Sequence, residues 1–202
     1  MPTAPPTTAP DPVFRAGRFD AVELRAGDVP RLQAFFDANP AHSLAVEGRP
    51  PPADAAQTEF DARPPDSFTY TRRWLLAFDD ASGTMIGVAD VVADLLAARV
   101  WHVGLFIVAT ARHGDGTAHA LYAALEAWMR ARGAAWIRLG VVTGNTRAER
   151  FWRRWGYVET RVREDIAMGE RVNTVRVLVK ALDGGDLAAY LERVPRDRPG
   201  AP

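Results

Sequence analysis

The stretch ARHGDGTAHALY, residues 111–122, places two glycines and two histidines at the start of an expected helix. Glycines at a helix N-terminus leave backbone N–H groups unpaired and directed outward, at the positive end of the helix dipole. Such a turn suits a pyrophosphate, and His113 and His119 add donors close by. The alternative is that Gly114 and Gly116 only turn the chain from a strand into a helix. On this stretch alone, both interpretations stay open.

Two better-known phosphate-binding patterns do not fit the stretch. The dinucleotide fingerprint GxGxxG needs a third small residue where His119 stands, and an acid at the end of the following strand, which carries Arg138 instead. The Walker pattern GxxxxGK[ST] needs a lysine beside its last glycine, but the only lysine of the chain is Lys180. The spacing therefore excludes both loops.

The composition is that of one globular domain. The chain has 202 residues, 48% of them hydrophobic, which suffices for one well-filled core. The formal net charge is zero, which gives no sign of nucleic-acid binding, and no apolar run is long enough to span a bilayer. The Pro- and Thr-rich start lacks the features of a secretory signal, so we expect a disordered tail at 1–18 and a cytoplasmic protein. Cysteine is absent, which rules out disulfides, thiolate metal sites and cysteine nucleophiles.

Patterning along the chain predicts an order of elements typical of a mixed sheet. Apolar runs and alternation predict strands over 21–26, 72–80, 84–95, 99–108, 134–142, 157–168 and 173–182. Capping residues and helical spacing predict helices that begin near Pro30, Gly116 and Asn145. Because hairpins occur in the middle and at the end, we expect an α/β (α+β) fold with a central sheet of six to seven mostly antiparallel strands, flanked by helices. This domain should cover 19–183, followed by a short helix and tail at 184–202.

Two motifs in this order resemble the Gcn5-related N-acetyltransferase (GNAT) superfamily. The family signature [Q/R]-x-x-G-x-[G/A] matches residues 113–118, with His113 in the first place. A second family pattern, N-x-x-A-x-x-[F/L]-Y-x-x-x-G-[F/Y], fits at five positions: Asn145, Ala148, Phe151, Gly156 and Tyr157. Trp152 stands where that pattern has tyrosine. Both motifs fall on the expected elements, and the resemblance covers about 21–182.

The resemblance implies where acetyl-coenzyme A binds. In the family, backbone amides of the loop hold its pyrophosphate, so Asp115 should turn outward. The implied cofactor contacts are Phe106, Val108, His113, Gly114, Asp115, Gly116, Thr117, Ala118, His119, Asn145 and Trp152. Phe106 and Val108 should lie beside the pantetheine arm, with the Val108 main chain bonded to it as to a neighbouring strand. Core packing is the alternative for both side chains.

His102 is the candidate catalytic residue. Side chains alternate along a strand, so His102 should share the face of Phe106 and Val108 unless a bulge intervenes. The resemblance places those two residues beside the cofactor, where several family members carry a glutamate base. A neutral imidazole, with an ordinary pKa of about 6.5, is available at neutral pH as a base or to order a water. The alternative is a histidine that packs within the sheet.

Other side chains bear on the proton transfers. Asp90 or Asp94 could bind a cationic amine or steer the histidine, although at least one of them is expected to face water. Trp152 replaces the family's tyrosine, and an indole N–H is no useful acid. Water, or another tyrosine such as Tyr70 or Tyr122, would then protonate the leaving thiolate, or the enzyme would do without an acid.

The function implied is acetyl transfer from acetyl-coenzyme A to a primary amine of a small molecule or a peptide. Without a cysteine to carry the acetyl group, transfer should be direct within a ternary complex. Two alternatives stay open: a catalytically weak or inactive module that senses acyl-coenzyme A, and a ligand-free domain used for protein contacts. No metal, nucleic acid or membrane is expected as a partner, and a homodimer is left open.

Overall fold

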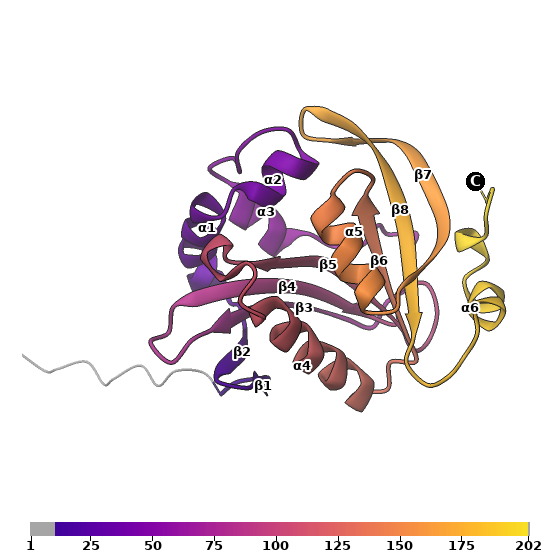
Figure 1. Ribbon diagram of the computed structural model, residues 1–202, viewed down its shortest axis with the longest axis horizontal. Helices are drawn as coiled ribbons and strands as arrows, with labels where there is room; N and C mark the ends of the chain where they lie inside the picture. Colours follow the sequence, from indigo (N-terminus) through magenta and orange to yellow (C-terminus); the bar gives the residue numbers. More distant parts are fainter. Residues whose placement is uncertain (1–10, 202) are drawn as a thin grey trace, which may run out of the picture.

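One eight-stranded sheet forms the centre of the protein in the computed structural model, which describes residues 11–201 (Figure 1). Its strands are β1 (Phe14–Ala16), β2 (Phe19–Glu23), β3 (Arg72–Asp79), β4 (Met85–Ala93), β5 (Val100–Val108), β6 (Trp136–Val142), β7 (Val158–Met168) and β8 (Arg171–Ala181). They lie in the order β1-β2-β3-β4-β5-β6-β8-β7, and every neighbouring pair is antiparallel except β5 with β6. The mixed, mostly antiparallel sheet of the prediction is therefore confirmed, with eight strands instead of six to seven.

Helices cover both faces of the sheet. They are α1 (Val29–Ala38), α2 (Ala41–Val46), α3 (Ala55–Asp61), α4 (Thr117–Ala131), α5 (Thr146–Arg154) and α6 (Leu187–Arg193), with short 3-10 turns η1 (Ala26–Asp28), η2 (Thr110–Arg112) and η3 (Pro195–Asp197). Figure 1 shows α4 and α5 side by side in front of the sheet and α6 near the C-terminus. On that face, which we call the α4/α5 face, Leu121 and Trp152 pack in one core with Leu76. On the other, the α1/α3 face, Leu32 packs in a second core with Leu75. The two cores follow from alternation along β3.

β5 and β6 pair over only part of their length. Their parallel ladder runs from Val100 with Trp136 to Val103 with Leu139. Within residues 11–201, no pairing joins the two strands beyond that point, although β5 continues to Val108. The C-terminal half of β5 therefore keeps one unpaired edge, and this edge leads directly to the glycine stretch of 111–122.

A β-bulge interrupts β5 at the point where β6 departs. Val91 of β4 pairs with Val103, but the next β4 residue, Asp90, pairs with Leu105, so Gly104 has no partner. A residue without a partner shifts all later side chains of the strand to the opposite face. The bulge thus decides which side chains of β5 lie together.

Both ends of the described chain carry ordered structure. β1 lies at Phe14–Ala16, inside the range 1–18 in which the sequence predicts a tail, while residues 1–10 lie outside the described part. At the other end, Asp197 is 1% exposed and ion-paired with Arg138 of β6, at 2.7 Å between Nε and Oδ2. The C-terminal segment is therefore packed against the sheet. Among residues 11–201, no helix combines the length and the apolar composition that a membrane crossing requires.

Candidate functional site

The glycine stretch forms the turn into α4. Gly114 and Gly116 have φ angles of +89° and +87°, a left-handed conformation that glycine adopts without strain. A Cβ on either residue would meet nothing within 4 Å, so the turn is open to a ligand. Gly116 is the N-cap of the 15-residue α4, and no side chain of the N-cap closes the helix. The first amides of α4 therefore form a donor site for an anion.

Asp115 occupies one of these donors. Its carboxylate is exposed, as predicted for a side chain turned outward, but Oδ1 also accepts the Thr117 N–H at 2.8 Å. These hydrogen bonds from Thr117 lower the pKa of Asp115. An anion at the loop would use the other amides, or would take the Thr117 N–H as Asp115 moves away.

His113 joins the loop to the end of β5 and to α5. Its Nε2 lies 3.0 Å from the Val108 carbonyl oxygen, and its Nδ1 contacts Arg147 Nη1. Because a carbonyl only accepts and a guanidinium only donates, Nε2 carries the hydrogen and Nδ1 accepts. His119, one turn into α4, is exposed and stacks on Trp155 with ring centroids 5.8 Å apart.

The main chain of β5 faces the unpaired edge at two positions. The Ala109 N–H donates to the carbonyl oxygen of Ile86 in β4, at 2.9 Å. Main-chain groups alternate in direction along a strand, so Phe106 and Val108 direct their N–H and C=O groups away from β4. Their side chains pack on the α4/α5 face. Phe106 lies among aromatic rings, with Trp152 at a centroid distance of 6.0 Å. The side chains therefore pack in the core, while the Phe106 main chain and the Val108 N–H face the unpaired edge; the Val108 carbonyl accepts from His113.

His102 does not share a face with Phe106 and Val108. The extra residue at Gly104 breaks the alternation, so His102 and Leu105 lie on the α1/α3 face while Phe106 and Val108 lie on the α4/α5 face. The prediction of one shared face is wrong, because a bulge cannot be read from the period of the strand.

The surroundings of His102 make it a weak base. Arg138 Nη1 lies 3.5 Å from its Nδ1, so that nitrogen is the acceptor and Nε2 carries the hydrogen. Burial, with the positive charge of Arg138 second, lowers the pKa of His102 to about 3. At neutral pH the ring is uncharged, and Nε2–H can donate to a water or a carbonyl.

The two motif residues of α5 have structural contacts. Asn145 is the N-cap, and its Oδ1 accepts the Ala148 N–H at 3.3 Å. Trp152 is 7% exposed and packs on Tyr122 and Tyr157. Those two tyrosines share a buried hydrogen bond of 2.5 Å, and burial raises the pKa of each well above its ordinary value. Neither tyrosine is placed to give a proton readily.

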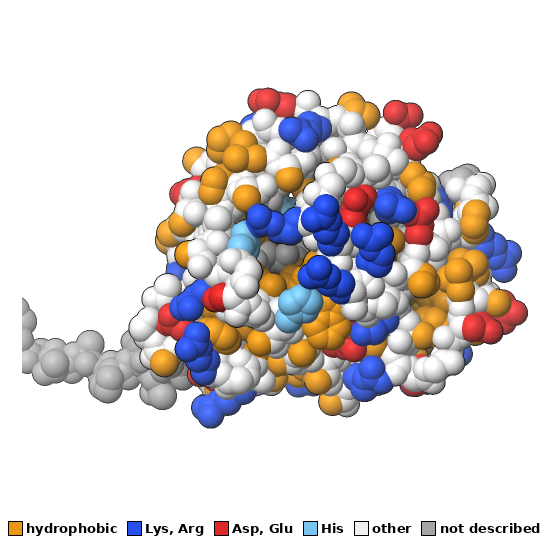
Figure 2. All heavy atoms as spheres, viewed as in Figure 1, with side chains coloured by type: hydrophobic (Ala, Val, Ile, Leu, Met, Phe, Trp, Pro, Cys, Tyr) orange, Lys and Arg blue, Asp and Glu red, His pale blue; other side chains and the backbone are white. Residues whose placement is uncertain are grey.

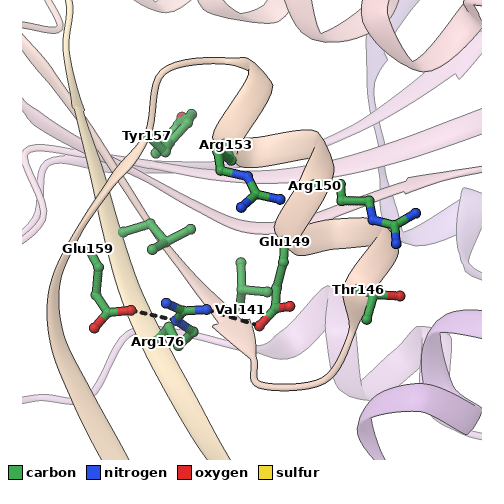
Figure 3. Close-up of a pocket in the computed structure, with 9 residues that line it drawn as sticks. Val141, Thr146, Glu149, Arg150, Arg153, Tyr157, Glu159 and Arg176 are labelled. Carbon is green, nitrogen blue, oxygen red and sulfur yellow. Dashed lines mark hydrogen bonds and ion pairs between the residues drawn. The ribbon is translucent and has the colours of Figure 1, made fainter.

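Basic side chains gather beside the loop. Figure 2 shows Lys and Arg side chains over α5 around a hollow, with two histidines at its edge. α5 contributes four exposed arginines: Arg147, Arg150, Arg153 and Arg154. Two of them line a separate pocket of about 390 Å³ between α5 and β8, where Arg176 bridges Glu149 and Glu159 (Figure 3). None of the side chains predicted for the site lines that pocket.

The α1/α3 face carries a charged cluster that the sequence did not reveal. Arg73 of β3 lies between Glu59 of α3 and Asp90 of β4, at 3.0 Å and 2.8 Å. Asp90 is one of the two aspartates considered from the sequence, while Asp94 accepts the Arg99 N–H in the turn before β5. Nothing in the sequence pattern links Glu59 to either residue. Within 11–201, no group of three or more His, Asp or Glu side chains is arranged to hold a metal ion.

A comparison with known families assigns the chain. A sequence profile described as the Acetyltransferase (GNAT) family matches residues 34–157, more than half of the chain. The protein belongs to the GNAT acetyltransferase family. The glycine loop, the unpaired edge of β5, His102 and the charged cluster all lie within the matched residues.

Solved structures share the GNAT fold. Spermidine N-acetyltransferase from Vibrio cholerae, in complex with CoA and spermine, has a TM-score of 0.62 and 16% identity over 81% of this chain and 95% of that chain. The ribosomal-protein-S18-alanine N-acetyltransferase from Escherichia coli has a TM-score of 0.60 and 14% identity over 84% and 97%. A GCN5-related N-acetyltransferase from Kribbella flavida has a TM-score of 0.59 and 20% identity over 82% and 98%. No curated protein sequence matches the chain. At such identities the likeness establishes the fold of this GNAT protein.

Proposed function

We propose that the protein is an acetyl-coenzyme A-dependent N-acetyltransferase that acts on a primary amine by direct transfer. The observation that carries the proposal is the unpaired edge of β5, which ends at the glycine loop. Such an edge offers main-chain donors and acceptors to an extended ligand as a neighbouring strand would. Membership in the GNAT family supports the same conclusion.

The residues present fit coenzyme A. Gly114 and Gly116 leave open space at the amides of α4, which would hold the pyrophosphate, with Thr117, Ala118 and His119 in the first turn and His113 and Asp115 at the rim. The Phe106 main chain and the Val108 N–H would pair with the pantetheine arm, since the Val108 carbonyl accepts from His113. Asn145 and Trp152 would border the arm from α5. The bound cofactor supplies the thioester that carries the acetyl group.

The same geometry supports a location for the reactive end of the cofactor. The loop follows the C-terminus of β5, so an arm that runs from the loop along Val108 and Phe106 ends near Gly104, where β5 and β6 meet. Gly104 and Gly140 are both exposed although they lie within strands, so solvent and acceptor can reach this point. Main-chain N–H groups of β5 would polarise the thioester carbonyl.

We assign His102 the task of ordering a water and not that of the base. It lies beside Gly104 on the α1/α3 face, and its low pKa keeps it neutral with Nε2–H as a donor. Transfer is direct because the chain has no cysteine to carry the acetyl group. Water protonates the leaving thiolate, since Tyr122 and Tyr157 are bonded to each other in the core.

The acceptor is a primary amine of a small molecule or a peptide. Two similar structures are named as enzymes that act on spermidine and on the alanine of a ribosomal protein, which represent these two classes. We expect the protein to act in the cytoplasm.

The test combines binding and turnover. Calorimetry with coenzyme A should show binding, and release of free thiol from acetyl-coenzyme A should depend on an added amine. Binding without turnover on any amine would favour the acyl-coenzyme A sensing module, and absence of binding would overturn the proposal. For His102, the variant His102→Ala should lower kcat and leave the shape of the pH profile unchanged, because the ring is neutral throughout the working range. An unchanged kcat would remove His102 from the mechanism.

A further inference from the structure

Arg73 is shared by two carboxylates on the α1/α3 face. Its Nη2 lies 3.0 Å from Glu59 Oε1, and its Nε lies 2.8 Å from Asp90 Oδ1. The guanidinium also donates to the main-chain carbonyls of Glu59 and Phe60, at 2.6 Å and 3.1 Å, and the Arg73 side chain is only 9% exposed. Three elements thus hold this cluster in place: α3, β3 and β4.

Asp90 lies directly over the bulge. A Cβ added to Gly104 would stand 2.6 Å from Asp90 Oδ2, so the carboxylate would have to shift. Asp90 and Gly104 therefore fit each other, and the exposed glycine leaves the carboxylate at the border of the open point between β5 and β6. This is the point at which the proposed cofactor arm ends.

The cluster is short of one positive charge. Two carboxylates face one guanidinium, and the next cation, Arg63, is exposed and donates to the carbonyls of Phe60 and Ala62. His102, which lies on β5 on the same face, is neutral. Asp90 Oδ1 is buried, and its partner at 2.8 Å is Arg73 Nε, from a guanidinium that Glu59 shares. A largely buried carboxylate that shares its guanidinium with a second carboxylate favours a further cationic partner.

Burial changes the proton affinity of both acids. It raises the pKa of Glu59 to about 7, with the negative charge of Asp90 as the second cause, against the lowering effect of Arg73. Burial also raises the pKa of Asp90, while Arg73 and then Arg63 lower it. Stronger bases than ordinary carboxylates are what removal of a proton from an ammonium needs.

We propose that Asp90 binds the ammonium group of the acceptor over Gly104 and takes its proton, and that Glu59 is a positioning residue that acts through Arg73. The inference rests on the proposed acetyl transfer and adds the acceptor class: aliphatic amines that arrive as cations, in preference to aromatic amines, which are uncharged at neutral pH. Glu59 keeps Asp90 basic, because it takes up part of the positive charge of Arg73.

The step balances in protons and electrons. The acceptor ammonium gives one proton to the Asp90 carboxylate and becomes a neutral amine. The nitrogen lone pair then forms the N–C bond to the acetyl carbon as the C–S bond breaks, and that electron pair leaves on sulfur. The second nitrogen proton reaches the thiolate through water. Asp90 returns its proton to solvent at the exposed Gly104, while Glu59, 26% exposed, lies beside a pocket of about 240 Å³ lined by Phe60, Arg63, Tyr70 and Arg73.

Steady-state kinetics with spermidine, glycinamide and aniline test the inference. Asp90→Asn should lower kcat/KM for the aliphatic amines by about 100-fold or more. Glu59→Gln should move the acidic limb of the pH profile to lower pH. The Arg73 guanidinium then pairs with the Asp90 carboxylate alone and lowers the pKa of Asp90. Glu23→Gln is the matched control: Glu23 lines the same pocket but pairs with the exposed Arg72 at 2.8 Å, so its kinetics should match the wild type.

Further measurements separate this inference from the proposed function. Coenzyme A binding should be the same in all three variants, and this binding also shows that they fold. If Asp90→Asn does not fold, Gly104→Ala takes its place, because an alanine there displaces the Asp90 carboxylate. Calorimetry of spermidine against the protein saturated with coenzyme A needs no turnover, and Asp90→Asn should weaken that binding about tenfold or more. Coenzyme A binding with unchanged amine affinity in Asp90→Asn, or a preference for aniline, would overturn the inference. Loss of coenzyme A binding in the wild type would instead refute the proposed function.

Discussion

The loop at the start of α4 and the charged cluster on the α1/α3 face build their parts of the site in different ways. The loop offers main-chain amides held by Gly114 and Gly116, and its side chains stand at the rim. The cluster offers the side chains of Glu59, Arg73 and Asp90, which come from three separate elements. A main-chain site tolerates unusual side chains, whereas a side-chain site fails when one member is removed.

This difference explains the departures in the motifs. His113 and Trp152 replace the residues usual in the family, yet the amides of α4 and the edge of β5 remain available. On the α1/α3 face, by contrast, the charged groups interact through their side chains. Asp197, for example, accepts from Arg138 and from Tyr190.

The largest effect expected from the comparison is on stability at the α1/α3 face. Asp197→Ala leaves the guanidinium of Arg138 buried without its partner, and it should cost about 3–5 kcal/mol in the free energy of unfolding. Asp183→Ala is the control, since the pair of Asp183 with Arg99 is about half exposed, and it should cost less than about 1 kcal/mol. Urea titration measures both. Equal losses would show that the C-terminal segment is not anchored by this pair.

A smaller effect is expected at the loop, where binding and not folding should respond. Gly116→Ala and Gly133→Ala both place a Cβ at a left-handed residue, with φ +87° and +95° and open space around it. Each should lose about 1–2 kcal/mol of stability. Only Gly116→Ala, at the N-terminus of α4, should also weaken coenzyme A binding, by about tenfold or more. If calorimetry gives the two variants the same Kd, the loop is only a turn.

The smallest effect is a change in how stability depends on pH. The pKa of Glu59 is raised from 4.5 to about 7 by folding, so its contribution to stability is full below about pH 4.5 and is lost as the pH rises to about 7. Glu59→Gln should remove this loss. A change of about 1 kcal/mol in the free energy of unfolding would reduce the fall in Tm between pH 5 and pH 8 by roughly 2–4 °C. Glu23→Gln should leave the fall unchanged. An unchanged slope in Glu59→Gln as well would mean that Glu59 is ionised throughout.

His102 should act in the opposite direction. Its pKa is lowered from 6.5 to about 3, so the stability it contributes is present above about 6.5 and is lost as the pH falls toward 3. The two residues lie on the same face, but their pH effects have opposite signs because burial disfavours whichever form is charged.

The fold and the loop could be predicted from the sequence, because both depend on local patterns. Alternation placed most strands, and the glycines with their helix placed the donor site between β5 and α4. β1 was missed, since three residues carry too little pattern. The contacts assigned to Phe106, Val108 and the loop remain predictions about a ligand.

The sequence by itself determined the family, the class of the sheet and the turn at Gly114 and Gly116, because spacing and backbone freedom act over a few residues. Only the tertiary structure decided the rest. The bulge at Gly104 moved His102 to the face opposite Phe106, and the packing of α3 on β3 and β4 brought Glu59 to Asp90 across 31 positions of the chain. Such contacts are set by the packing of whole elements, which no local pattern records, and they carry the proposed choice of acceptor.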